Sequence, residues 1–217
     1  MNNETKLLIE KKVPIYFIVF YIVGLVLFAV PVTRELFISI TSFTLLLVIG
    51  IVFFFHKLWN TKTIIVFSAI IVLSFLLEMV GVSSGIPFGI YHYDNGLGLK
   101  LLNTPIIIGL NWLFLVYATQ AIVFKIFENN SSKILIGSLL MVMYDLLMEY
   151  VAPTMNMWHF TNTYPPISNF VTWFFAALFF HTLLVTNKIN VENNTARSLF
   201  WIQMVFFIII GVFKFIK

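Results

Sequence analysis

The stretch MYDLLMEYVAP, residues 143–153, places two acidic side chains in a run that is long and apolar enough to cross a membrane. The whole chain has the same character, because 60% of its 217 residues are hydrophobic, 10% are charged and the mean hydropathy is +0.99. A soluble domain of this length could not keep so much apolar surface in contact with water. The sequence therefore predicts an integral membrane protein, in which Asp145 and Glu149 need an explanation.

Seven apolar stretches account for most of the chain. A helix of about 17–25 apolar residues crosses a hydrocarbon core of about 30 Å. We expect an all-α, polytopic transmembrane helix bundle, with one domain over residues 1–217 and a polar N-terminal tail over 1–13. Two segments expected on the outer side, 81–104 and 153–168, are too polar and too rich in turn residues to cross lipid. The predicted spans are 14–31, 36–55, 63–80, 105–124, 133–152, 169–187 and 197–216.

The basic residues predict the orientation of the bundle. Nine of the thirteen Lys and Arg residues fall on the side of the N-terminus and four on the other side. Because positive residues favour the inner side, the N-terminus is expected inside and the C-terminus outside. Loop lysines of this kind explain the net charge of +4 without a nucleic-acid partner. The absence of cysteine excludes disulfides and thiolate chemistry.

Asp145 and Glu149 lie four residues apart and so share one helix face. A carboxylate near the centre of a span costs about 2.5–3.5 kcal/mol, and such residues face the bundle interior or a wet cavity. Glu78 and Asn111 fall at a similar depth in neighbouring spans, and Asn169 begins the sixth span at that level. Close acids in a poor dielectric do not both ionise readily, so a protonated acid beside a base is expected. Simple hydrogen bonding between helices is the alternative.

The outer segments add aromatic and imidazole side chains near these acids. Desolvated aromatic faces stabilise a cation by about 0.5–2 kcal/mol each, although Trp at this level also serves as an interfacial anchor. The predicted catalytic residues are Asp145, Glu149 and Glu78. The predicted substrate-binding residues are Phe88, Tyr91, His92, Tyr93, Asn111, Trp112, Trp158 and His159.

A metal site is a second interpretation of the histidines. His92 and His159 could bind a metal together with Asp94 or with the buried acids, as in a metal-dependent intramembrane lipid hydrolase. The chain has no HExxH motif and no repeated histidine box. We therefore expect no metal and no other cofactor, and keep the hydrolase as an alternative.

Three motifs carry a resemblance to a known family. They are E-x-x-G at Glu78–Gly81, G-x-P-F-G-x-Y-x-Y at Gly85–Tyr93 and D-x-x-x-E-x-x-A at Asp145–Ala152. Together they resemble the membrane carotenoid-biosynthesis family that includes carotenoid 1,2-hydratases and the bisanhydrobacterioruberin hydratase of halophilic archaea. The likeness covers residues 75–173, and the stretch MWHF at Trp158 departs from the W-x-W pattern of the family.

The resemblance implies a carotenoid hydratase of a bacterial or archaeal cell membrane. It would add water to the terminal 1,2 double bond of an acyclic carotenoid without a redox cofactor. Its partners would be the carotenoid, water and the lipid bilayer, and association with other carotenoid enzymes is left open. Asp145 is the expected acid, Glu149 or Glu78 the expected base, with Asn111 and His92 tuning them. A lycopene-cyclase-like activity begins with the same protonation and is the closer alternative.

Overall fold

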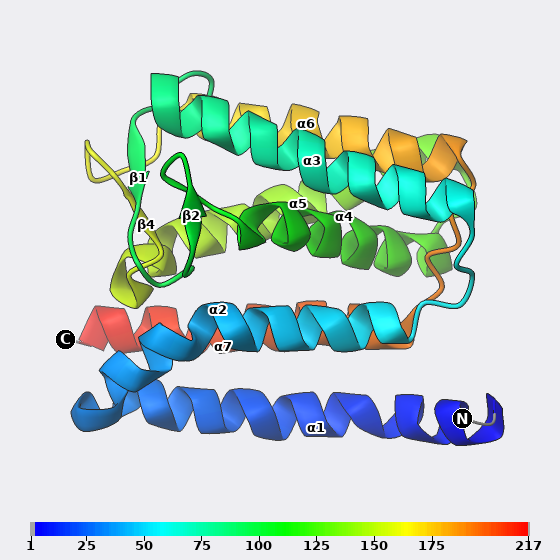
Figure 1. Cartoon of the computed structure of the whole chain (residues 1–217), viewed down its shortest axis with the longest axis horizontal. Helices are drawn as coiled ribbons and strands as arrows, with labels where there is room; N and C mark the ends of the chain where they lie inside the picture. Colours follow the sequence, from blue (N-terminus) through cyan, green and yellow to red (C-terminus); the bar gives the residue numbers. More distant parts are fainter. Residues whose placement is uncertain (1–2, 217) are drawn as a thin grey trace.

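The structure is a computed structural model that describes residues 3–216, and it confirms the predicted all-α bundle of seven membrane-spanning helices (Figure 1). Each of the seven is long and apolar enough to cross a bilayer. The helices are α1 (Asn3–Ala29), α2 (Pro31–Phe54), α3 (Thr61–Ser84), α4 (Ile107–Ile126), α5 (Asn130–Val151), α6 (Ile167–Thr186) and α7 (Asn194–Ile216).

Helix α4 forms the centre of the bundle. Its residues from Trp112 to Val123 are all buried, whereas the other helices keep one face exposed. In Figure 1, α4 and α5 lie between the pair α3 and α6 and the pair α2 and α7, with α1 at the edge. An exposed apolar face on every outer helix is what a lipid environment requires, since lipid tails cover these side chains.

Most of the polar N-terminal segment belongs to helix α1. The expected polar tail over residues 1–13 is helical from Asn3 onward, because its residues are good helix formers and α1 continues beyond the apolar run. Lys6 lies 5.2 Å from the centre of the Phe54 ring, at the end of α2. A long lysine stem can cover apolar surface while its charge stays in water, so polar residues extend the helix without breaking it.

The polar segments between helices gather at one end of the bundle, which we call the loop end. Helix α3 continues to Ser84, so the first of these segments begins later than the expected residue 81, and a 3-10 turn, η1 (Ala152–Met155), follows α5. Figure 1 shows the strands and the C-terminus at this end and the N-terminus at the other. The strands are β1 (Tyr91–Tyr93), β2 (Lys100–Leu101), β3 (Thr104–Pro105) and β4 (Trp158–Phe160).

Pairing of β1 with β4 joins the two polar segments. The strands are antiparallel, with Tyr91 opposite Phe160 and Tyr93 opposite Trp158, and β2 pairs with β3 in a separate hairpin. Successive side chains of a strand point to opposite faces. Tyr91 and Tyr93 are accordingly buried toward the helices, while His92 between them is exposed.

Candidate active site

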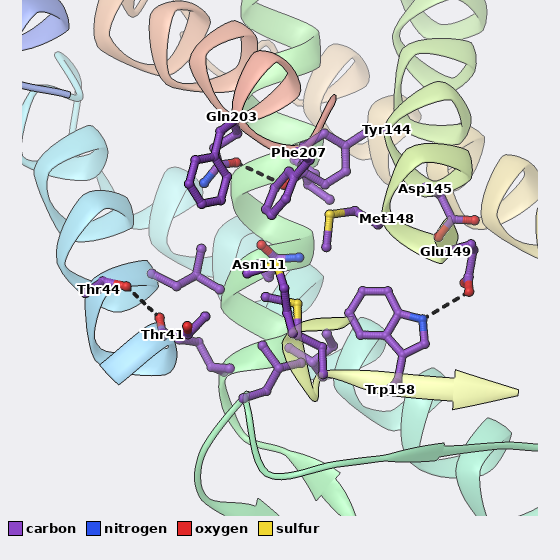
Figure 2. Close-up of a pocket in the computed structure, with 18 of the residues that line it drawn as sticks. Thr41, Thr44, Asn111, Tyr144, Asp145, Met148, Glu149, Trp158, Gln203 and Phe207 are labelled. Carbon is purple, nitrogen blue, oxygen red and sulfur yellow. Dashed lines mark hydrogen bonds between the residues drawn. The ribbon is translucent and has the colours of Figure 1, made fainter. Parts of the chain in front are cut away.

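A cavity beneath the loop end contains the three acids that the sequence singled out. It encloses about 1240 Å³ of space free of protein atoms, part of it open to the surroundings, and Glu78, Asp145 and Glu149 all line it. Figure 2 shows Asp145 and Glu149 on α5, with Trp158 and Asn111 nearby. The rest of the wall is largely aliphatic and aromatic, as in most sites for small apolar molecules.

Glu78 is buried and accepts three hydrogen bonds. The hydroxyls of Tyr91 and Tyr93 donate to Oε2 at 2.6 and 2.8 Å, and the indole Nε1 of Trp112 donates to Oε1 at 2.9 Å. Burial and the Glu78 carboxylate raise the pKa of Tyr91 and of Tyr93, so both phenols stay protonated and remain donors. The site is built to hold Glu78 as an acceptor.

Local geometry brings the two phenols to Glu78. The alternation of β1 turns Tyr91 and Tyr93 inward together. Gly81, one turn after Glu78 on α3, leaves room for them: a Cβ atom there would lie 2.4 Å from Cδ2 of Phe88 and 3.1 Å from the Tyr91 hydroxyl. The E-x-x-G motif therefore combines the carboxyl with the gap that lets its donors approach.

Asn169 of α6 connects the two acids of α5. Its Nδ2 donates to Oδ2 of Asp145 at 3.0 Å and to Oε1 of Glu149 at 3.3 Å, so one amide nitrogen serves both carboxyls. Trp158 of β4 donates to the other oxygen of Glu149 at 3.1 Å. Asp145 is fully buried, and its Oδ1 has no hydrogen-bond partner among residues 3–216.

Aromatic rings surround this group of carboxyls. The rings of Trp112 and Trp173 stack at 4.1 Å between centroids with an angle of 19°. Phe88, Phe160 and Trp173 line the cavity, and Phe160 lies 5.3 Å from the Tyr91 ring. These faces offer a cation-stabilising surface next to the acids.

The structure separates the predicted binding residues into two sets. Phe88, Tyr91, Tyr93, Asn111 and Trp158 line the cavity, and Trp112 stands behind it in contact with Glu78. The Asn111 side chain has no hydrogen-bond partner among the described residues, so the structure does not connect it to either acid of α5 as expected.

The two histidines of the loop end lie outside the cavity. His92 is exposed, and His159 pairs with Asp94 at 2.9 Å on the outer surface. Their positions across the β1–β4 pair, opposite each other, direct both rings away from the acids. The structure therefore places neither histidine in the cavity wall, and neither is hydrogen-bonded to the acids that it was expected to tune. Nowhere in residues 3–216 do three His, Asp or Glu side chains converge as a metal site.

Sequence reasoning missed part of the cavity wall. Spans one, two and seven had contributed only length and hydropathy, yet Tyr21 of α1, Thr41 of α2 and Gln203 of α7 line the cavity. Trp173 was not among the predicted binding residues, and Asn169 was placed at the right depth without its bridging role. Depth along each helix was a usable signal for Asn169, whereas no signal in one sequence indicates which helices adjoin.

Fold and site together define a class: an integral membrane protein of seven helices whose interior cavity joins several carboxyls to an apolar, aromatic wall. Residues 16–216 match the protein family described as "Carotenoid biosynthesis protein". The chain belongs to this family, as the motifs predicted, and it has a role in carotenoid biosynthesis. The match includes spans one, two and seven. Neither the curated proteins nor the solved structures contain a match to this chain.

Proposed function

We propose that the protein is a carotenoid hydratase that adds water to the terminal 1,2 double bond of an acyclic carotenoid end group. The observation that carries the proposal is the set of three carboxyls with different hydrogen-bond partners in one apolar cavity. Hydration of an unactivated alkene needs a shielded acid, stabilisation of a cation and a base for water. Each role has a candidate in this cavity.

Asp145 is the proposed acid. It is fully buried, and its Oδ1 has no partner within the described chain, so this oxygen is free to carry a proton and present it to substrate. Transfer of that proton to carbon 2 forms a C–H bond, uses the electron pair of the double bond and leaves a tertiary cation at carbon 1.

Glu78 and the aromatic wall are the proposed stabilisers of that cation. With three donors, Glu78 is held as a fixed acceptor and is a poor choice for moving protons. A preorganised negative group close to developing positive charge lowers the barrier. Trp173, stacked on the Trp112 ring that also binds Glu78, presents an aromatic face to the same cavity.

Glu149 is the proposed base. Within residues 3–216 each of its oxygens accepts one hydrogen bond, Oε1 from Asn169 and Oε2 from Trp158, which leaves lone pairs for a water molecule. The water oxygen bonds to carbon 1, and its proton passes to Glu149. Return of this proton to Asp145, one helical turn away and bound to the same amide, restores the starting state.

The surroundings suit two very different reactants. The polyene would enter from the bilayer, and water would come from the loop end, where Tyr93, Asp94 and Lys100 line a polar crevice beside the cavity. We place the N-terminus on the inner side and the loop end on the outer side, as the count of basic residues indicates.

The test is pigment analysis of a lycopene-producing host that expresses the full chain. The expected product is heavier than its precursor by one water per reacted end. A product of unchanged mass with new rings would show that the protein is a cyclase, in which an alkene instead of water captures the same cation. If the host expressing the wild-type chain contains the same pigments as a host expressing the Asp145→Asn variant, neither the hydratase nor the cyclase activity is present.

A further inference from the structure

A second polar group lies in the wall of the same cavity. Tyr144 of α5 donates to Oε1 of Gln203 of α7 at 3.0 Å, and Nε2 of Gln203 donates to the hydroxyl oxygen of Tyr21 of α1 at 2.8 Å. We call these three residues the phenol–amide chain. In Figure 2, Gln203 lies on the other side of Tyr144 from Asp145 and Glu149, so the chain is separate from the acids.

The phenol–amide chain cannot satisfy both of its hydroxyl hydrogens. The Gln203 carbonyl accepts from Tyr144, and the amide nitrogen donates to Tyr21, so the O–H of Tyr21 has no acceptor within residues 3–216. If the amide were turned around, Tyr21 would donate and the O–H of Tyr144 would be left over. Either arrangement leaves one phenol donor unpaired at the cavity wall.

The apolar surroundings make the unpaired phenol hydroxyl energetically unfavourable. Tyr21 packs edge-on against Phe206 at 4.9 Å, and Tyr144 packs against Phe207 at 5.9 Å, both distances between ring centroids. Thr41 and Thr44, also in the wall, donate to carbonyls of their own helix, and within the described residues neither threonine oxygen accepts a hydrogen bond from Tyr21 or Tyr144. An unpaired donor in apolar surroundings is unfavourable, and an oxygen atom of a bound molecule would relieve it.

We propose that the phenol–amide chain is a binding subsite for an acceptor oxygen of the substrate. Resting on the hydratase function, this identifies the substrate class as an isoprenoid polyene that already carries a hydroxyl or keto group. Tyr144 and Asp145 are consecutive residues of one rigid helix, so the subsite and the acid are held at a fixed separation. An oxygen bound at the subsite therefore selects which double bond reaches Asp145.

The test compares two acyclic polyenes of equal length, one a hydrocarbon and one with a hydroxyl or keto group. Affinity for the purified full-length protein is measured by quenching of tryptophan fluorescence, since Trp158 and Trp173 line the cavity. One hydrogen bond predicts about 3- to 10-fold tighter binding of the oxygenated polyene. Equal affinity for the two would overturn the proposal, since another oxygen, such as a lipid ester carbonyl, would then be the partner.

Variants test whether the phenol–amide chain causes the tighter binding of the oxygenated polyene. Tyr21→Phe should reduce the ratio of affinities, and a triple change of Tyr21→Phe, Tyr144→Phe and Gln203→Leu should bring it to about one. The triple change removes all three polar groups of the phenol–amide chain and leaves no new unpaired group, which favours correct folding. Tyr117→Phe is the matched control, because it removes the hydroxyl of a buried tyrosine that binds His56 away from the cavity. An unchanged ratio in the triple variant would overturn the subsite.

Binding and turnover together separate this proposal from the hydratase function. A preference for the oxygenated polyene without any addition of water would refute the hydratase and leave the subsite in place. Addition of water to both polyenes with equal affinity would refute the subsite and leave the hydratase in place.

Discussion

Tyr91 of strand β1 donates a hydrogen bond of 2.6 Å to Glu78 of helix α3, thirteen residues earlier in the chain. This contact ties the loop end to the membrane-embedded part of the site. It also shows that the polar segment after α3 is part of the candidate site, since its strand completes the surroundings of a buried carboxyl.

The hydroxyls of Tyr91 and Tyr93 should each contribute to activity through Glu78. Tyr91→Phe and Tyr93→Phe each remove one of three donors and keep the ring, so we expect about a 10-fold fall in turnover for each. The double variant should lose more than either. Product formation per amount of folded protein is the measurement, with Tyr164→Phe, an exposed tyrosine, as the control. Wild-type turnover in the double variant would contradict the role of Glu78.

Gly81→Ala should disturb the same contact from the side of α3. The new methyl group would lie within 2.4 Å of the Phe88 ring, so Phe88 and then Tyr91 must move. We expect a loss of activity together with a lower melting temperature. Gly50→Ala, on α2, is the matched control, because an added Cβ there meets no atom within 4 Å and should lower neither the activity nor the melting temperature. Equal behaviour of the two variants would show that the close approach at Gly81 is unimportant.

Asp145→Asn should abolish the addition of water while the bundle stays folded. A general acid contributes about 100- to 10,000-fold to a rate, and the amide cannot replace it. The measurement is product formation by mass, alongside binding of the polyene, which should change little. Glu192→Gln, an exposed acid paired with Lys57 at the other end of the bundle, should retain full activity. Hydration at more than a tenth of the wild-type rate would assign the acid elsewhere.

Asn169 should act as a positioning residue for both acids of α5. Asn169→Leu keeps the branched shape but removes the donor shared by Asp145 and Glu149, which should destabilise the fold by about 1–3 kcal/mol. We also expect the pH profile of turnover to shift, a change that a merely structural role would not produce. Asn169→Gln retains the amide and should recover part of the activity. An unaltered pH profile in the leucine variant would argue against this role.

His92→Ala should leave activity within about twofold of wild type, because surface substitutions away from a site have small effects. Its ring is exposed and turned away from the cavity, opposite His159. Activity of the same preparations with and without a strong chelator tests the metal-dependent alternative directly. A large loss in either experiment would return the histidines to the site.

The positions of the three acids could be predicted from the sequence, but only some of their hydrogen-bond partners could. Their i and i+4 spacing, together with depth counted along each helix, was sufficient to place Glu78, Asp145 and Glu149 near one level. Their hydrogen-bond partners were only partly accessible. Trp158 and the two tyrosines stood out as aromatic residues in polar segments, but the pairing of β1 with β4 that aims them inward is a contact between segments about sixty-five residues apart.

The positions of His92, His159 and Tyr21 relative to the cavity were not evident from the sequence. Residue type suggested that His92 and His159 belong to the site, while strand alternation places them outside. Tyr21 and Gln203 looked like ordinary residues of apolar spans, yet they meet at the cavity wall from opposite ends of the chain. Which helices become neighbours depends on packing over the whole bundle, and local patterns do not encode it.

The sequence by itself determined the membrane location, the seven helices and the presence of buried acids. Unpaired polar groups are costly in lipid, so a membrane-spanning segment is recognised by its apolar composition, and an acid within it must face the interior of the bundle. Only the tertiary structure decided which donors meet each carboxyl, which side chains face the cavity and that Tyr21 and Tyr144 share one amide, so that one phenol hydroxyl has no acceptor within residues 3–216. Those properties depend on distances of a few ångströms between segments far apart in the chain.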